Sequence, residues 1–189
     1  MKSITLLLSC LSAVMICHAD PNEDEQKFLT IESASSKVRP TKEEKFLKAE
    51  LPKDLVSILA GHDWGRDDGK LPESFIGYSM DLNSDGKKEY FIENIYGGSG
   101  GPAFFVLTQM QGSWKIILDF QGGFGVIPVE GGWPKIVCTG RSGGGLWSKT
   151  HYVFHRGSYH PTLHEGYARG AITKKQIALP TSDKESKKP

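Results

Sequence analysis

This sequence has very few cysteines, and that shortage excludes a disulfide-stapled fold. Its three cysteines are Cys10, Cys17 and Cys138. The first two lie in an N-terminal segment typical of a removable export signal, so the mature chain keeps one cysteine and cannot form an internal disulfide. Cys138 lies in a strand-like apolar run, which favours a buried, unreactive thiol over a nucleophile.

Net charge is also nearly absent. The chain has 23 basic and 22 acidic residues, and removal of the export signal takes away Lys2 and leaves the two signs equal. Bulk charge therefore does not draw this protein to nucleic acid or to a membrane surface, and we expect no nucleic-acid partner. After the first 19 residues no run is apolar and long enough to cross a bilayer, so we expect no transmembrane segment in the mature chain.

What the N-terminus does contain is a signal peptide pattern over residues 1–19. Lys2 gives the basic start, Ile4 to Ile16 is apolar, and small residues precede a cut before Asp20. The pattern predicts a periplasmic or secreted protein. A lipoprotein signal that uses Cys10 is the alternative and would anchor the chain to lipid. It ranks second because only a handful of apolar residues precede Cys10.

The rest of the chain divides into four parts. Residues 20–40 are polar and predict a flexible leader. Residues 41–61 have apolar side chains at helical spacing and end at Gly61, which predicts one or two short helices broken at Pro52. A β domain is expected over residues 62–170. The polar end, 171–189, predicts a disordered C-terminal tail.

Within the β domain a repeat is visible. Strand patterns separated by turn residues lie near 74–80, 89–96, 103–109, 114–120, 124–129, 135–139, 149–155 and 159–165. A shift of 46 residues places Gly86 on Gly132 and Tyr90-Phe91-Ile92 on Ile136-Val137-Cys138. Each copy has the length of a four-stranded propeller blade, but two copies are too few for a closed ring. We therefore expect a mainly β fold, α+β overall, with two four-stranded antiparallel blade-like repeats packed as a sandwich or small barrel.

The first copy contains an acidic loop, Asp81-Leu82-Asn83-Ser84-Asp85-Gly86-Lys87-Lys88-Glu89. Side-chain oxygens fall at alternate positions and a glycine follows, which is the donor type and the turn that a calcium loop needs. An Asx-rich turn without metal is the alternative, because Asn, Asp and Gly also favour turns. The second copy has Glu130-Gly131-Gly132-Trp133 at this place, so we expect one metal site at most.

This loop, followed by an apolar strand, resembles the calcium loop of FG-GAP and VCBS-type β-repeat proteins. The resemblance implies calcium as the cofactor. The implied ligands are the side chains of Asp81, Asn83, Asp85 and Glu89 and the backbone carbonyl of Lys87. Glu89 departs from the family, which usually has Asp there. Some bacterial periplasmic inhibitors of lysozyme-like cell-wall hydrolases, including immunity proteins, are similar to such proteins.

Two glycine-rich loops occupy equivalent places in the copies, after residues 96 and 141. They lack the Gly-Lys-Ser/Thr ending of a phosphate-binding loop, so nucleotide binding is not indicated. Their flanking residues Tyr96, Arg141 and Trp147 are of the types that binding surfaces use, and we identify them as a candidate binding surface. The histidines at 151 and 155 are about 13 Å apart along a strand, too far to share a zinc ion.

The sequence thus predicts an exported, calcium-binding β domain that binds a protein partner, with inhibition of a cell-wall hydrolase or immunity against one as the use that the resemblance implies. A secreted hydrolase acting on carbohydrate or peptide, with its site in the glycine-rich loops, is the first alternative. A purely structural envelope protein is the second. No pattern in the chain specifies a catalytic constellation, and enzymatic activity stays open.

Overall fold

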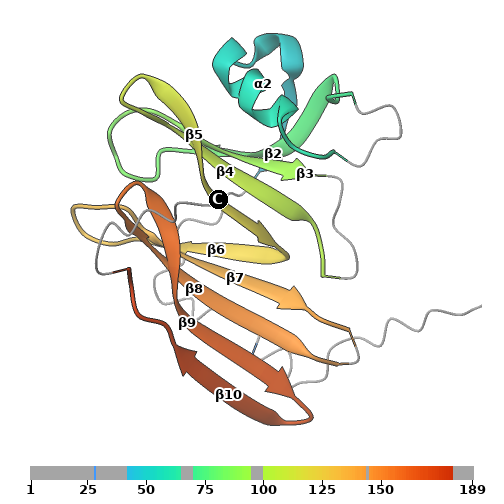
Figure 1. The fold of residues 1–189 in the computed structure, drawn as a ribbon, viewed down its shortest axis with the longest axis vertical. Helices are drawn as coiled ribbons and strands as arrows, with labels where there is room; N and C mark the ends of the chain where they lie inside the picture. The colour runs from blue at the N-terminus through green and yellow to red at the C-terminus, as the bar shows by residue number, and fades with distance from the viewer. Residues whose placement is uncertain (1–27, 29–41, 65–69, 95–99, 144, 181–189) are drawn as a thin grey trace, which may run out of the picture.

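The computed structural model describes residue 28 and residues 42–64, 70–94, 100–143 and 145–180. The predicted signal peptide, the predicted leader apart from Phe28, Tyr96 and residues 181–189 therefore lie outside the described residues. Two antiparallel sheets of five strands each make up most of the described chain (Figure 1). No ladder between described residues joins one sheet to the other, so the sheets form a sandwich rather than a barrel.

Within each sheet, the strands lie in the order of the sequence and each pairs with the next. Sheet one has the order β1 (Glu44–Leu47), β2 (Ser74–Met80), β3 (Glu89–Asn94), β4 (Ala103–Met110), β5 (Ser113–Gln121). Sheet two has the order β6 (Gly123–Ile127), β7 (Lys135–Arg141), β8 (Trp147–His155), β9 (Ser158–Ala168), β10 (Ala171–Gln176). The mainly β class and the two antiparallel sheets are confirmed; each sheet has a fifth strand that the sequence repeat does not contain.

The repeat appears as two matching meanders, β2–β5 and β6–β9. Both contain a bulge, at Val106/Leu107 opposite β5 and at His151/Tyr152 opposite β9. Both then make a two-residue turn with positive φ at each central residue: 51° and 82° at Gln111-Gly112, and 52° and 87° at Arg156-Gly157. This is the turn type whose twist matches that of the paired strands, and it fixes their register.

The two sheets join at a single residue, Gly122, which separates β5 from β6. Its φ is 108°, and a Cβ atom there would lie 1.9 Å from the carbonyl oxygen of Thr139. Only glycine combines that backbone conformation with that close approach. The chain therefore bends at Gly122 and carries its inward-facing side chains from one sheet directly into the other.

The core between the sheets is rich in aromatic rings. Phe91 stacks on Phe124 with centroids 4.8 Å apart, and Phe104 and Phe120 each pack on the same Phe124 ring. Val106, Ile136 and Cys138 complete the buried centre. Cys138 is 5% exposed, and burial raises the pKa of its thiol, which agrees with the expected unreactive role.

The outer face of sheet one carries a second apolar cluster under the helix. Helix α2 (Lys53–Ala60) lies over sheet one (Figure 1). Its Leu55 and Leu59 are both fully buried in this cluster. Pro52 precedes it and a short 3₁₀ turn, η2 (Lys48–Glu50), precedes Pro52, so the predicted break is confirmed. Gly61 follows as the C-terminal cap and donates its backbone N–H to Ile58.

The prediction of helix from residue 41 onward is wrong for 44–47, which form strand β1 at the open edge of β2. Phe46 is buried and its neighbours Lys45 and Leu47 are exposed, the alternation of a strand. Phe46 meets Tyr90 edge-on at 5.4 Å, so pairing and packing at the edge outweigh the helical spacing of Phe46, Leu47 and Leu51.

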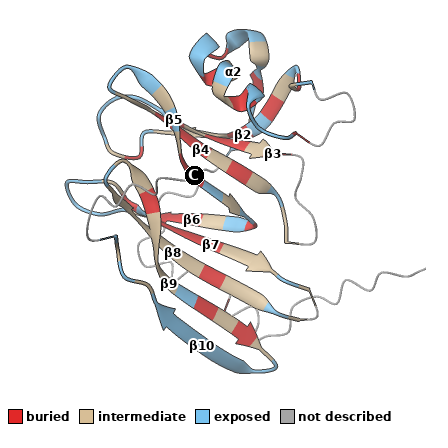
Figure 2. Ribbon diagram, in the orientation of Figure 1, coloured by how far each residue is buried: buried red, intermediate tan, exposed pale blue. Residues whose placement is uncertain are grey.

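The prediction of a disordered tail from residue 171 is wrong for 171–176, which form strand β10 against β9. All six residues are exposed, as Figure 2 shows, so the strand has no apolar pattern to reveal it. The signal is instead the turn at Arg169-Gly170, with φ of 49° and 82°, which has the same chemistry as Arg156-Gly157.

Candidate functional site

The acidic loop lies between β2 and β3 and is held by bonds from its own backbone. Ser84 and Gly86 have φ of 60° and 83°, so the chain turns sharply there. The Asp81 carboxylate accepts N–H bonds from Asp85 at 3.1 Å and from Gly86 at 2.9 Å. These bonds turn the Asp81 side chain into the loop.

The two other oxygen-bearing side chains point into the same turn. The Asn83 side-chain oxygen accepts from the Asp85 N–H at 3.1 Å, and the Asp85 carboxylate accepts from the Lys87 N–H at 2.8 Å. The Asn83 Nδ2 donates to Asp85 at 3.2 Å. The loop therefore gathers the oxygens of Asp81, Asn83 and Asp85 on one exposed turn, and each oxygen keeps a second lone pair.

Glu89 is used differently from these three. It is 1% exposed, and its Oε2 accepts the Leu82 N–H at 2.7 Å while its Oε1 accepts the Thr108 hydroxyl at 2.8 Å. Burial raises the pKa of the Glu89 carboxyl above its ordinary value against the effect of these two bonds, and the Asp85 and Asp81 charges raise it further. The hydrogen bond from Thr108 to Glu89 thus connects the end of the loop to β4, a contact that the sequence did not predict.

The donor chemistry of the loop suits calcium at Asp81, Asn83 and Asp85, because all three offer hard oxygens. Both Glu89 oxygens already hold protein donors, so Glu89 ties the loop to β4. Across the part of the chain that the structure describes, no group of three or more His, Cys, Asp or Glu side chains is arranged to hold a metal ion.

The corresponding turn of the second copy, between β6 and β7, has aromatic packing in place of acidic residues. Trp133 stacks on Phe154 with centroids 4.1 Å apart, and the Tyr159 hydroxyl donates to the Pro134 carbonyl at 3.0 Å. Glu130 is exposed. Burial raises the pKa of Tyr159. Ring stacking therefore fixes this turn where the first copy uses carboxylates.

The β7–β8 hairpin brings together two of the three residues of the candidate binding surface. Arg141 and Trp147 are cross-strand partners, and the guanidinium carbon lies 5.3 Å from the centre of the indole ring. The hairpin is closed by bonds from Ser142 N–H to Leu146 O and from Leu146 N–H to Gly143 O, both 2.9 Å. Leu146 remains 46% exposed at its tip.

Two polar atoms at this hairpin are buried without a hydrogen-bond acceptor among the described residues. They are the Arg141 Nε and the Trp147 Nε1. A buried donor without an acceptor costs about 1–3 kcal/mol. By contrast, the buried Trp64 donates its Nε1–H to the Leu59 carbonyl at 2.7 Å. Among the described residues, the Arg141 Nε and the Trp147 Nε1 are therefore the buried side-chain donors that have no hydrogen-bond acceptor.

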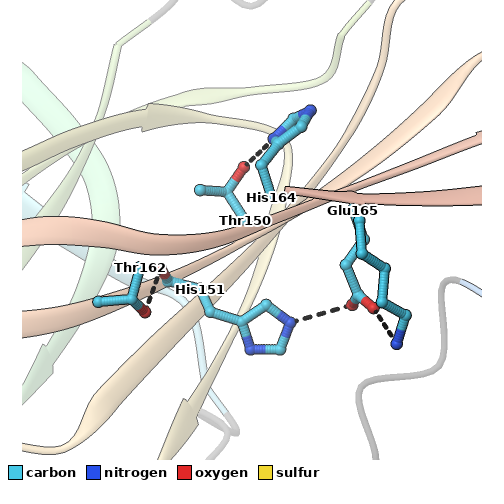
Figure 3. Close-up of polar contacts among 6 residues, drawn as sticks. Thr150, His151, Thr162, His164 and Glu165 are labelled. Atoms are coloured by element: carbon cyan, nitrogen blue, oxygen red, sulfur yellow. Dashed lines mark hydrogen bonds and ion pairs between the residues drawn. The ribbon is translucent and has the colours of Figure 1, made fainter. Parts of the chain in front are cut away.

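The histidines of β8 and β9 bind protein groups (Figure 3). His151 Nε2 lies 3.1 Å from the Glu165 carboxylate, and His164 Nδ1 lies 2.9 Å from the Thr150 hydroxyl. The Lys174 ammonium, from β10, lies 2.7 Å from the other Glu165 oxygen. Burial of the Glu165 carboxyl raises its pKa, but the bonds and charges of Lys174 and His151 together outweigh burial and lower it.

Phe28 is the one described residue of the leader, and it packs on sheet two. It is 6% exposed, stacks on Tyr167 with centroids 5.5 Å apart, and lies 4.9 Å under the Lys149 ammonium. Tyr167 is the cross-strand partner of Trp147. Phe28 is followed by Leu29 and Ile31 in a segment that was predicted to be a polar, flexible leader, and this contact was not predicted.

Comparison with protein-family models, with characterised proteins and with solved structures finds no match for this chain. Among the described residues no helix is long and apolar enough to cross a membrane.

Proposed function

We propose that this protein is an exported, calcium-binding β domain that acts as a protein-binding module. The observation that carries the proposal is the β7–β8 hairpin. It presents a half-buried tryptophan stacked with an arginine, two buried donors that have no acceptor in the part of the chain that the structure describes, and the exposed Leu146. Tryptophan and arginine supply much of the binding energy at protein interfaces, and an adjacent exposed apolar side chain adds area to bury.

Calcium is part of the proposal, at the turn formed by Asp81, Asn83 and Asp85. The bonds that these side chains accept from the loop backbone bring their oxygens together. When bound, the ion would offset the repulsion between Asp81 and Asp85. The loop connects β2 to β3, so ordering it would hold two central strands of sheet one in register.

Inhibition of a lysozyme-like cell-wall hydrolase, or immunity against one, is the specific use that we propose for this module. The sequence resemblance and the signal-peptide pattern of residues 1–19 support it, and the Arg141–Trp147 hairpin is the proposed contact surface. Sheet two holds that hairpin between central strands β7 and β8, so the surface is presented on a rigid element.

The test mixes the mature chain with purified cell-wall hydrolases, with calcium or with chelator, and measures complex stoichiometry and wall-degrading activity. We expect a stoichiometric complex of reduced activity that Trp147→Ala weakens at least tenfold, as loss of a central interface tryptophan does. Trp114→Ala, on the outer face of sheet one, is the matched control. If this chain alone degraded wall fragments, the proposal would be wrong and the protein would be a hydrolase.

A further inference from the structure

The Arg141–Trp147 pair also specifies the chemistry of what it binds. We infer that this site takes a carboxylate from an acidic segment of the protein partner, an inference that rests on the proposed function. The Arg141 Nε and the Trp147 Nε1 are donors only, so their ligand must supply acceptors. Because one donor belongs to a permanent cation, a negatively charged acceptor binds more strongly than a neutral one.

The charge of the surrounding face favours the same ligand. Register places these charged residues on the outer face of sheet two: Lys135, Arg141, Lys149, Lys174 and Glu165. Glu165 is the single carboxylate among the described residues of that face, and it already binds His151 and Lys174. Among the described residues of that face, basic side chains therefore outnumber the one carboxylate, although basic and acidic residues nearly balance over the whole chain. The basic side chains Arg141 and Lys135 favour an acidic partner over a basic one.

Two features select a side-chain carboxylate of a protein over a phosphate group. The site offers one guanidinium and one neutral indole, a donor set for two oxygens, whereas phosphate sites usually combine several cations or a helix N-terminus. Leu146, exposed next to the pair, gives an apolar surface for the methylene groups of an Asp or Glu side chain. Arg141 and Trp147 are themselves only half-buried, but the two donor atoms are buried, so these side chains must move before a carboxylate binds.

The experiment uses the mature chain labelled with ¹⁵N and follows the Arg141 Nε–H and Trp147 Nε1–H signals by NMR. The probes are sodium acetate, sodium phosphate and sodium chloride at equal ionic strength, then an acetylated tri-glutamate amide and its tri-glutamine counterpart. We expect acetate and tri-glutamate to shift both signals saturably, and chloride and tri-glutamine to leave them in place. The indole signal of Trp64, already bonded to Leu59, is the internal reference and stays unchanged.

Three variants sharpen the result. Trp147→Phe keeps the ring and loses one donor, and Arg141→Lys keeps the charge and loses the Nε; each is expected to weaken tri-glutamate binding about tenfold. Arg169→Lys, in the exposed β9–β10 turn, is the matched control and leaves binding unchanged. If a variant fails to fold, the wild-type titration still decides.

Equal shifts with chloride and acetate, or equal binding by Arg141→Lys and Arg169→Lys, would overturn the inference. Tighter binding of phosphate than of acetate would overturn it in favour of a phosphate ligand. The proposed function fails separately: a hydrolase complex indifferent to Arg141→Lys refutes only the carboxylate, whereas acetate binding without any hydrolase complex refutes only the proposed partner.

Discussion

The two outer faces of the sandwich differ in what covers them. On sheet one, α2 seals an apolar surface with Leu55 and Leu59, both fully buried. On sheet two the outward-facing residues of the strands include Lys149, His151 and Glu165. His151 contacts the Glu165 carboxylate, and the Lys149 ammonium lies over the ring of Phe28. The described contacts of the first face are apolar, whereas those of the second combine ion pairs with buried aromatic rings. The energetic consequence is that similar substitutions have very different effects on the two faces.

The largest expected effect lies under the helix. Leu55→Ala should lower the free energy of unfolding by about 3 kcal/mol, because it removes buried methyl groups and leaves a cavity. The matched variant on sheet two is Ile172→Ala, at a β10 side chain that is 53% exposed, with a loss within about 0.5 kcal/mol. Urea unfolding of both variants checks the contrast, and equal losses would show that α2 does not seal sheet one.

The next largest effect is the response of stability to calcium, which we expect from the acidic loop 81–89 and not from the corresponding turn 130–133 of the second copy. At a hundredfold excess over its dissociation constant, calcium should stabilise the fold by about 2.7 kcal/mol, because it binds the native state alone. Asp81→Ala should abolish the rise in melting temperature, and Glu130→Ala, from the corresponding turn, should leave it. A melting curve indifferent to calcium and to chelator would make the loop a metal-free Asx turn.

A smaller contrast is expected in the pH dependence of the two buried glutamates. The pKa of Glu165 is lowered by folding, so its contribution is present above the unfolded pKa and is lost as the pH falls through the folded one. The pKa of Glu89 is raised, mainly by burial, so its ionisation costs stability as the pH rises from the unfolded pKa through the folded one.

Urea unfolding between pH 3 and 7 of Glu165→Gln and Glu89→Gln separates the two contributions. The stability difference between wild type and Glu165→Gln should shrink toward low pH. The difference for Glu89→Gln should change in the opposite direction, in favour of wild type as the pH falls. Parallel curves for the two variants would contradict the contrast.

The smallest effect is expected at the exposed end of the charged face. The Lys174 side chain is 65% exposed, so its 2.7 Å pair with Glu165 is screened by solvent. Lys174→Ala should change the free energy of unfolding by no more than about 0.5 kcal/mol, and less in high salt. A loss above about 1.5 kcal/mol would mean that β10 depends on this ion pair.

Turn chemistry and strand alternation made the centre of the fold predictable. Gly112 and Gly157 mark equivalent hairpins, and the strands around them follow the expected ranges closely. The two edge strands were missed for different reasons. Phe46 and its neighbours fit a helical spacing as well as an alternation, and only the open edge of β2 decides between them. Strand β10 has no buried side chain, so no periodicity exists in its sequence.

The candidate site was predictable in its residue types and less so in its contacts. The spacing of Asp81, Asn83 and Asp85 predicted a calcium loop, with a metal-free Asx turn as the alternative. The structure contains the turn that both share, and calcium stays a prediction. That Glu89 is turned inward to Thr108 depends on a partner 19 residues away, which a local pattern does not include. Arg141 and Trp147 were identified by residue type, but their pairing and their missing acceptors follow from the strand register.

The neighbour-to-neighbour order of the strands has a consequence for how fast the chain folds. No described strand pairs with a strand that is distant in the sequence, as strands of a Greek-key sandwich do. Loop closure therefore costs little entropy at each step. Folding rate rises as contacts become more local. The hairpin at Gln111-Gly112 can form early in the first half, and the hairpin at Arg156-Gly157 can form early in the second. The slow step is then the packing of the two meanders against each other about Gly122. We therefore expect this sandwich to fold faster than Greek-key sandwiches of the same length.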